Sequence, residues 1–178
     1  QPPLPKKHSN VIENIGFGTI NKIFIRFEQR WWDDGWKGLQ LLWNEDHNDD
    51  SHWTKFISGF DVAYPAPDNT LVAWIGGKGA VEMENFDNQV VSSELMKIIR
   101  KFMNREDIPD PTHFYCSRWH SNEFVGGAYS FTSRQTDHID DWEKILSQPI
   151  TFESSNNDRN VILFAGEAIH PQYFSTVH

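Results

Sequence analysis

The chain has 178 residues, a formal net charge of −9 at pH 7, one cysteine and eight tryptophans. Its length is sufficient for a hydrophobic core, and its negative charge argues against a nucleic-acid-binding surface while it is compatible with cationic ligands. The lone Cys116 excludes an internal disulfide framework, and no stretch approaches the roughly 18 consecutive apolar residues that a membrane-spanning helix needs.

The first half of the chain predicts an antiparallel sheet. Prolines near the N-terminus indicate an extended connection. Alternation after Gly16 predicts a strand ending at Phe27, with Lys22 on one face and Ile23 on the other. We expect further strands at 38–43, 55–64 and 70–75, the last ended by a glycine-rich break at 76–79. Together these strands would form an antiparallel meander.

The segment 44–51 is rich in Asp, Glu and His side chains, which are common metal ligands. Their spacing matches no metal-binding signature. We therefore predict a solvated acidic loop here and no metal site.

The second half of the chain predicts helices and a closing strand. Asp87 is placed to cap a helix whose apolar stripe ends at Phe102. We expect a strand at 112–119, a short helix at 137–146 and a polar linker at 151–160. The apolar run 161–165 predicts a fully buried strand ending at Gly166, with Ser175 and Thr176 as candidate caps of a final helix.

Three motifs carry a resemblance to a known family. The segment Leu163-Phe-Ala-Gly-Glu-Ala168, followed by Ser175 and Thr176, resembles the C-terminal flavin-binding motif of flavin-containing amine oxidases, closest to the polyamine oxidase branch. The Gly18-x-x-x-Lys22 segment resembles the part of that family whose lysine holds a water at the flavin N5. Trp119 and Tyr129, ten residues apart around a glycine pair, match a third segment.

The resemblance implies FAD as the cofactor and assigns roles to individual residues. Lys22 would be catalytic, with an ordinary lysine at a sheet edge as the alternative. Tyr129 and Thr176 would bind substrate. The residues implied to bind FAD are Trp119, Gly166, Glu167, Ser175, Thr176 and Val177.

The implied reaction is hydride transfer from a polyamine to the flavin, hydrolysis of the imine, and reduction of O2 to hydrogen peroxide. The expected partners are a polyamine (spermine, spermidine or an N-acetyl form) and O2, with no nucleic acid. We expect a cytoplasmic location, with the peroxisome as the alternative. Monoamine oxidase and histone demethylase remain alternatives within the family; a tryptophan-rich glycan-binding module and an inactive truncated homologue remain outside it.

The fold class expected is α+β, within an α/β enzyme. Residues 1–121 would form the later half of a substrate-binding domain, a mixed or antiparallel sheet with covering helices. Residues 122–178 would form the final strand, turn and helix of a Rossmann-like FAD domain. Because a G-x-G-x-x-G turn is missing, we expect the C-terminal part of a longer enzyme, which alone is inactive and binds flavin weakly.

Overall fold

A computed structural model describes residues 3–43, 52–65, 67–153, 159–170, 172–173 and 175. The chain divides into two compact units. We call Thr19–Ala128 the sheet unit, and Gln1–Gly18 with Tyr129–His178 the terminal unit. The terminal unit thus combines the first residues of the chain with its last fifty, whereas the sequence division had grouped residues 1–18 with the sheet.

The sheet unit contains a five-stranded antiparallel sheet in the order β3-β4-β5-β2-β6. Its strands are β2 (Ile20–Arg26), β3 (Gly38–Gln40), β4 (Ile57–Val62), β5 (Thr70–Gly76) and β6 (His113–Cys116). Only β3, β4 and β5 follow the predicted meander. Strand β2, first in sequence, lies between β5 and β6, so the sheet differs from a simple meander.

Strand β2 has the two faces that alternation predicts. Ile23 and Ile25 are buried, whereas Lys22 and Phe24 are half-buried. The buried face belongs to one core with Leu95 and the other apolar side chains of helix α3. Lys22 therefore lies on the opposite face from this core.

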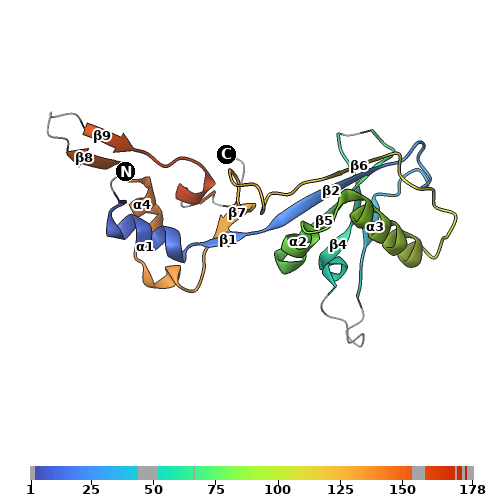
Figure 1. Ribbon diagram of the computed structural model, residues 1–178, viewed down its shortest axis with the longest axis horizontal. Helices are drawn as coiled ribbons and strands as arrows, with labels where there is room; N and C mark the ends of the chain where they lie inside the picture. The colour runs from blue at the N-terminus through green and yellow to red at the C-terminus, as the bar shows by residue number, and fades with distance from the viewer. Residues whose placement is uncertain are drawn as a thin grey trace. The chain divides into compact units, whose positions relative to one another are not determined.

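Two helices cover the buried face of the sheet, α2 (Gly77–Met83) and α3 (Asn88–Met103) (Figure 1). The Asp87 side chain accepts a hydrogen bond from the Val90 N–H, so it caps α3 as predicted. The glycines at 76–79, predicted to be a break, instead open α2. Gly79 is required there because a Cβ would lie 2.4 Å from the Cβ of Phe56 in the 3-10 helix η1 (Trp53–Phe56).

The terminal unit is built on a helix that the sequence analysis did not predict. Helix α1 (Lys6–Asn14) packs against α4 (Trp142–Ser147), and their core consists of Val11, Trp142 and Leu146. A short 3-10 helix η2 (Thr136–His138) precedes α4, so the helix predicted at 137–146 is split in two. Strands β1 (Gly16–Gly18) and β7 (Tyr129–Phe131) pair beside them.

The end of the terminal unit differs from the sequence prediction. Strands β8 (Ile150–Glu153) and β9 (Arg159–Ile162) form an antiparallel pair where a linker was expected. The predicted buried strand 161–165 is wrong in this structure, since Val161 is 51% and Leu163 66% exposed. A two-stranded ribbon buries its side chains only where another layer covers it. The short 3-10 helix η3 (Glu167–Ile169) follows.

Within the described ranges, no helix has the length and apolar character needed to cross a bilayer.

Candidate functional site

Lys22 lies in the interior of the sheet, on the face that the helices leave open. It is directly opposite Trp74 on β5, and its Nζ lies 4.5 Å from the centroid of the Trp74 ring. With the described residues Lys22 makes no ion pair. The ammonium is thus held by an aromatic face and keeps its hydrogen-bond donors available.

The open face around Lys22 is aromatic. Trp74 is 37% and Tyr115 62% exposed, and the Phe24 and Tyr115 rings lie 6.3 Å apart. An exposed apolar surface with one embedded cation is more typical of a binding wall than of an ordinary sheet surface.

The backbone of Lys22 is fixed from both sides by Ser117. The Lys22 N–H donates to Ser117 Oγ (2.8 Å), and the Ser117 N–H donates to the Lys22 carbonyl (2.9 Å). Ser117 is only 3% exposed. Its hydroxyl in turn donates to Asn21 Oδ1 (3.0 Å), which joins the lysine to a buried polar network.

Asn21 is the centre of this network and is completely buried. Its Oδ1 also accepts from the Trp119 N–H (3.2 Å), and its Nδ2 donates to Glu84 Oε1 (2.7 Å). Asn21 therefore connects two predicted site residues: Lys22, which follows it on β2, and Trp119, whose N–H donates to it.

The Glu84 carboxylate completes the network. It accepts from the His120 N–H (3.0 Å, Oε1) and the Ser121 N–H (2.7 Å, Oε2). Burial acts to raise the pKa of Glu84, but the hydrogen bonds from Ser121, Asn21 and His120 outweigh it and hold the pKa below its usual value. Glu84 is thus stabilised as the ionised acceptor.

Arg118 attaches the segment 117–121 to the end of α2. Its guanidinium donates to the carbonyls of Glu84 (2.7 Å) and Phe86 (2.8 Å) and to Asn88 Oδ1 (2.9 Å). Carbonyls at a helix end lack intrahelical donors, so the arginine satisfies them and orders the turn between α2 and α3.

Sequence reasoning missed Asn21, Ser117 and Glu84. One signal was present: alternation places Asn21 on the same face as Ile23 and Ile25, and an amide on an apolar face requires partners. The partners of Asn21 lie 63 to 98 residues away in sequence, and no local pattern indicates them.

In the terminal unit, Glu167 links three parts of the chain. Its carboxylate accepts from the Ser130 N–H (2.8 Å, Oε1), the Ser130 hydroxyl (2.8 Å, Oε2) and the Ser175 N–H (2.5 Å, Oε2). The Ser175 hydroxyl also donates to the Ser130 carbonyl. Glu167 and Ser175, predicted to bind FAD, are therefore brought together by β7.

This arrangement fits a hydroxyl-bearing ligand such as the FAD ribose. A carboxylate offers about four acceptor positions, and the protein uses three of them. Oε1 accepts a single bond from the described residues. One acceptor position on Oε1 thus remains for a hydroxyl donor.

Gly166 directly precedes Glu167, and Tyr129 directly precedes its partner Ser130. Gly166 has φ 118°, a conformation that side-chain-bearing residues rarely adopt, and a Cβ there would meet nothing within 4 Å. Tyr129 pairs with Gly18, where a Cβ would lie 3.4 Å from the tyrosine ring. The predicted residues Thr176 and Val177 lie outside the described residues.

An apolar cavity of about 300 Å³ borders Glu167 within the terminal unit. Phe17, Phe164 and Ile169 line it, together with Ser130. A polar anchor beside an apolar hollow is the usual composition of a small-molecule site.

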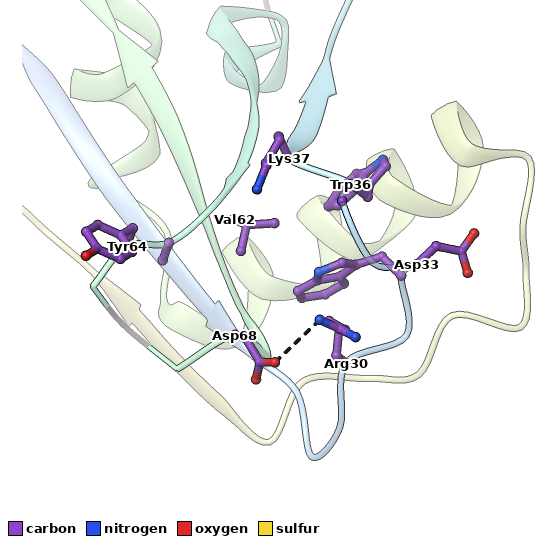
Figure 2. A pocket seen from close by; sticks show the side chains of 10 residues that line it. Arg30, Asp33, Trp36, Lys37, Val62, Tyr64 and Asp68 are labelled. Atoms are coloured by element: carbon purple, nitrogen blue, oxygen red, sulfur yellow. Dashed lines mark hydrogen bonds and ion pairs between the residues drawn. The ribbon is translucent and has the colours of Figure 1, made fainter.

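A second cavity, of about 370 Å³, lies in the sheet unit beside Arg30, Trp36 and Lys37, and Figure 2 shows the Arg30–Asp68 ion pair at its edge. None of the predicted site residues lines it. The neighbouring tryptophans serve packing: Trp31, Trp32 and Trp36 form a cluster with ring centroids 5.0 to 5.9 Å apart, and Trp32 is 6% exposed.

Among the described residues no three His, Cys, Asp or Glu side chains gather as a metal site requires. The acidic segment 44–51 lies outside the described ranges.

Comparison with known structures shows the fold. The structure of wild-type putrescine oxidase bound to putrescine matches 99% of this chain with a TM-score of 0.70 and 18% identity, and the match covers 35% of that chain. The A394C mutant of the same enzyme gives a TM-score of 0.67. The chain therefore has the α+β fold of this region of an amine oxidase.

Comparison of sequences shows the relatives. The peroxisomal N(1)-acetyl-spermine/spermidine oxidases of Bos taurus and Homo sapiens are 32% and 33% identical to this chain, over 100% and 99% of its length. Human lysine-specific histone demethylase 2 is 25% identical over 99% of it. The chain spans 36% of the length of the two oxidases and 20% of the demethylase.

A family model, flavin containing amine oxidoreductase, matches residues 1–178. The predicted resemblance and the predicted cofactor, FAD, are confirmed by this match and by the relatives above. The chain therefore belongs to the flavin-containing amine oxidoreductase family.

Proposed function

We propose that the enzyme containing this chain is an FAD-dependent polyamine oxidase that acts on spermine, spermidine or their N-acetyl forms, uses O2 and releases hydrogen peroxide. The observation that carries the proposal is the placement of Lys22: an ammonium on an interior strand, without an ion pair among the described residues, over the Trp74 ring and on the same open face as Phe24.

In this proposal bound flavin supplies the two-electron oxidation of the amine. The residues of this chain supply binding and charge. Lys22 holds a water and a positive charge where oxygen is reduced and where the imine meets water. With the cofactor bound, Trp119 would pack against it, and Glu167 would accept a ribose hydroxyl through the remaining acceptor position of Oε1.

The remaining predicted residues complete the proposed site. Gly166 allows close backbone approach to the cofactor. The family resemblance would assign Ser175 and Val177 to the pyrimidine end of the flavin, and Tyr129 and Thr176 to the walls of the substrate slot. A slot with one aromatic wall would leave room for a secondary amine with chains on both sides.

Three observations support a polyamine substrate. Two relatives whose names specify acetylated polyamines are 32% and 33% identical to this chain, against 25% for the human demethylase. The net charge of −9 favours a cationic substrate. The aromatic face beside Lys22 suits the carbon chains between the amines of such a substrate.

We also propose how the parts of the chain belong to the two domains of the enzyme. The sheet unit supplies part of the substrate domain, and the C-terminal segment supplies the end of the FAD domain. We propose a cytoplasmic or peroxisomal enzyme, since the relatives' names specify the peroxisome and a lone cysteine fits a reducing compartment.

The experiment compares substrates and a lysine variant in the full-length, flavin-loaded enzyme. We expect kcat/KM for spermine or N1-acetylspermine to exceed that for benzylamine by at least about a hundredfold, about 2.7 kcal/mol of discrimination. Equal turnover of benzylamine, or a preference for a methylated histone-tail peptide, would refute the polyamine assignment while leaving the flavin chemistry intact.

Lys22→Met should slow flavin reoxidation by O2 much more than flavin reduction by amine in stopped-flow absorbance. The matched control is Lys37→Met, since Lys37 belongs to the same unit but borders the cavity of Figure 2. Unchanged reoxidation in Lys22→Met would return Lys22 to the role of an ordinary sheet lysine.

A further inference from the structure

The function proposed above assigns no role to the buried polar network around Asn21. It consists of one completely buried amide, one half-buried carboxylate and one buried hydroxyl, from β2, the end of α2 and the residue after β6. A buried polar group costs free energy unless it is satisfied, and a hydrophobic residue at position 21 would complete the apolar face of β2 more simply. The cost of burying these polar groups therefore indicates a specific role for the network.

We propose that Asn21 and Glu84, linked through Ser117, are positioning residues: they clamp the segment 117–121 to strand β2 and thereby set the placement of Lys22 and Trp119 relative to each other. The proposal rests on the function proposed above for Lys22 and Trp119.

The first argument is the direction of the hydrogen bonds. The N–H groups of Trp119, His120 and Ser121 all donate to side chains of the clamp. This segment follows β6, so its backbone donors are no longer paired in the sheet. Three consecutive donors are thus held by Asn21 and Glu84, which set the path of the chain through Trp119 together with Arg118 and its bonds to the carbonyls of Glu84 and Phe86.

The second argument is the link to Lys22. Asn21 precedes Lys22 on β2, and Ser117 bonds both backbone groups of Lys22 as well as the Asn21 amide oxygen. A shift of the 117–121 segment would therefore act directly on the backbone of the lysine. Reacting groups misplaced by about 1 Å can lose up to about a hundredfold in rate, so such a clamp has functional value.

The third argument is the choice of a carboxylate. Glu84 accepts three hydrogen bonds, from Asn21, His120 and Ser121, with both oxygens in use. Glutamine at this position would present an N–H₂ group to at least one of those donors. Only an ionised acid matches the pattern, which makes Glu84→Gln a nearly isosteric test.

The experiment uses the full-length, flavin-loaded enzyme with Glu84→Gln and Ser117→Ala, and Glu82→Gln as the matched control. Glu82 lies two residues away and loses the same charge, but it holds no part of the 117–121 segment. Hydrogen exchange, followed by mass spectrometry, reports the amides of 119–121. Stopped-flow absorbance reports the rate constants and the apparent amine affinity.

We expect Glu84→Gln to lose amide protection at 119–121 while β2 and β5 keep theirs. Flavin content should be retained, and the rate constants of flavin reduction and reoxidation at saturating amine should fall about tenfold, with amine affinity changed less than about twofold. Ser117→Ala should show the same pattern in weaker form, and Glu82→Gln should match the wild type.

Unchanged protection at 119–121 would overturn the clamp, and lost protection with unchanged rate constants would overturn its positioning role. If Lys22→Met itself left every rate constant unchanged, the proposed function of Lys22 would fail, whereas the exchange data would still decide whether Asn21 and Glu84 hold the segment.

Discussion

Lys22 and Trp74 face each other across the β2–β5 pair, with the ammonium 4.5 Å from the centre of the indole ring. The ring limits where the long lysine side chain can lie on the open face.

The Lys22–Trp74 contact should contribute measurably to stability. A partly exposed cation–π pair contributes about 0.5–1 kcal/mol. In a double-mutant cycle of Lys22→Met, Trp74→Leu and the double variant, urea unfolding should give a coupling energy in that range. Trp74→Phe, which keeps an aromatic face, should retain more of it. Additive single variants would show that the contact contributes nothing.

Asp87 should be the most sensitive exposed position of α3. It accepts the Val90 N–H at 2.9 Å, and loss of such a cap costs typically about 1 kcal/mol. We expect Asp87→Ala to lower the urea midpoint with an unchanged m-value, and Asp87→Asn, which keeps an acceptor, to do so much less. An equal loss in both variants would point to the charge rather than to the cap.

Cys116 should react slowly with thiol reagents in the folded protein. Burial raises the pKa of its thiol to about 11, and its Sγ lies 3.2 Å from Met83 Sδ. The thiolate is the reactive form, so labelling by a disulfide reagent at pH 8 should be about a hundredfold slower than in urea on this ground alone. Rapid labelling of folded protein would contradict the buried position.

Glu84 should make stability depend on pH on the acidic side. Its pKa in the folded state lies below the ordinary value of 4.5, so it contributes stability above that pH and loses the contribution as the pH falls through the folded-state pKa. Glu84→Gln should therefore be less stable than the wild type near neutral pH, and the difference should shrink on acidification below 4.5.

Strand β2 and helix α3 could be predicted from the sequence because their determinants are local. The period-two alternation around Lys22 and the Asp87 cap with its apolar stripe lie within single segments. Helix α1 was missed because prolines preceding it indicated an extended chain, although Val11 and Ile15 at helical spacing face its core. Gly79 of α2 was misjudged because its close contact with Phe56 joins positions far apart in the sequence.

The candidate site was predicted only in part for the same reason. The motifs predicted Lys22, Trp119 and Glu167 as site residues, and these assignments stay predictions. The motifs could not identify Ser130 as the partner of Glu167, 37 residues away, or Glu84 as the partner of Ser121, 37 residues away. Contacts of that kind depend on the packing of separate elements, which a local pattern does not encode.

The strand order of the sheet has a consequence for how the lysine face forms. Strand β2 precedes both of its neighbours in the chain: β5 begins 50 residues after it and β6 begins 93 residues after it. Long-range strand pairing is slow because loop closure must precede it. The carbonyl and amide of Lys22 obtain their Ser117 partners only once β6 docks, so the lysine is made before both neighbouring strands and is fixed only after the later of them is in place.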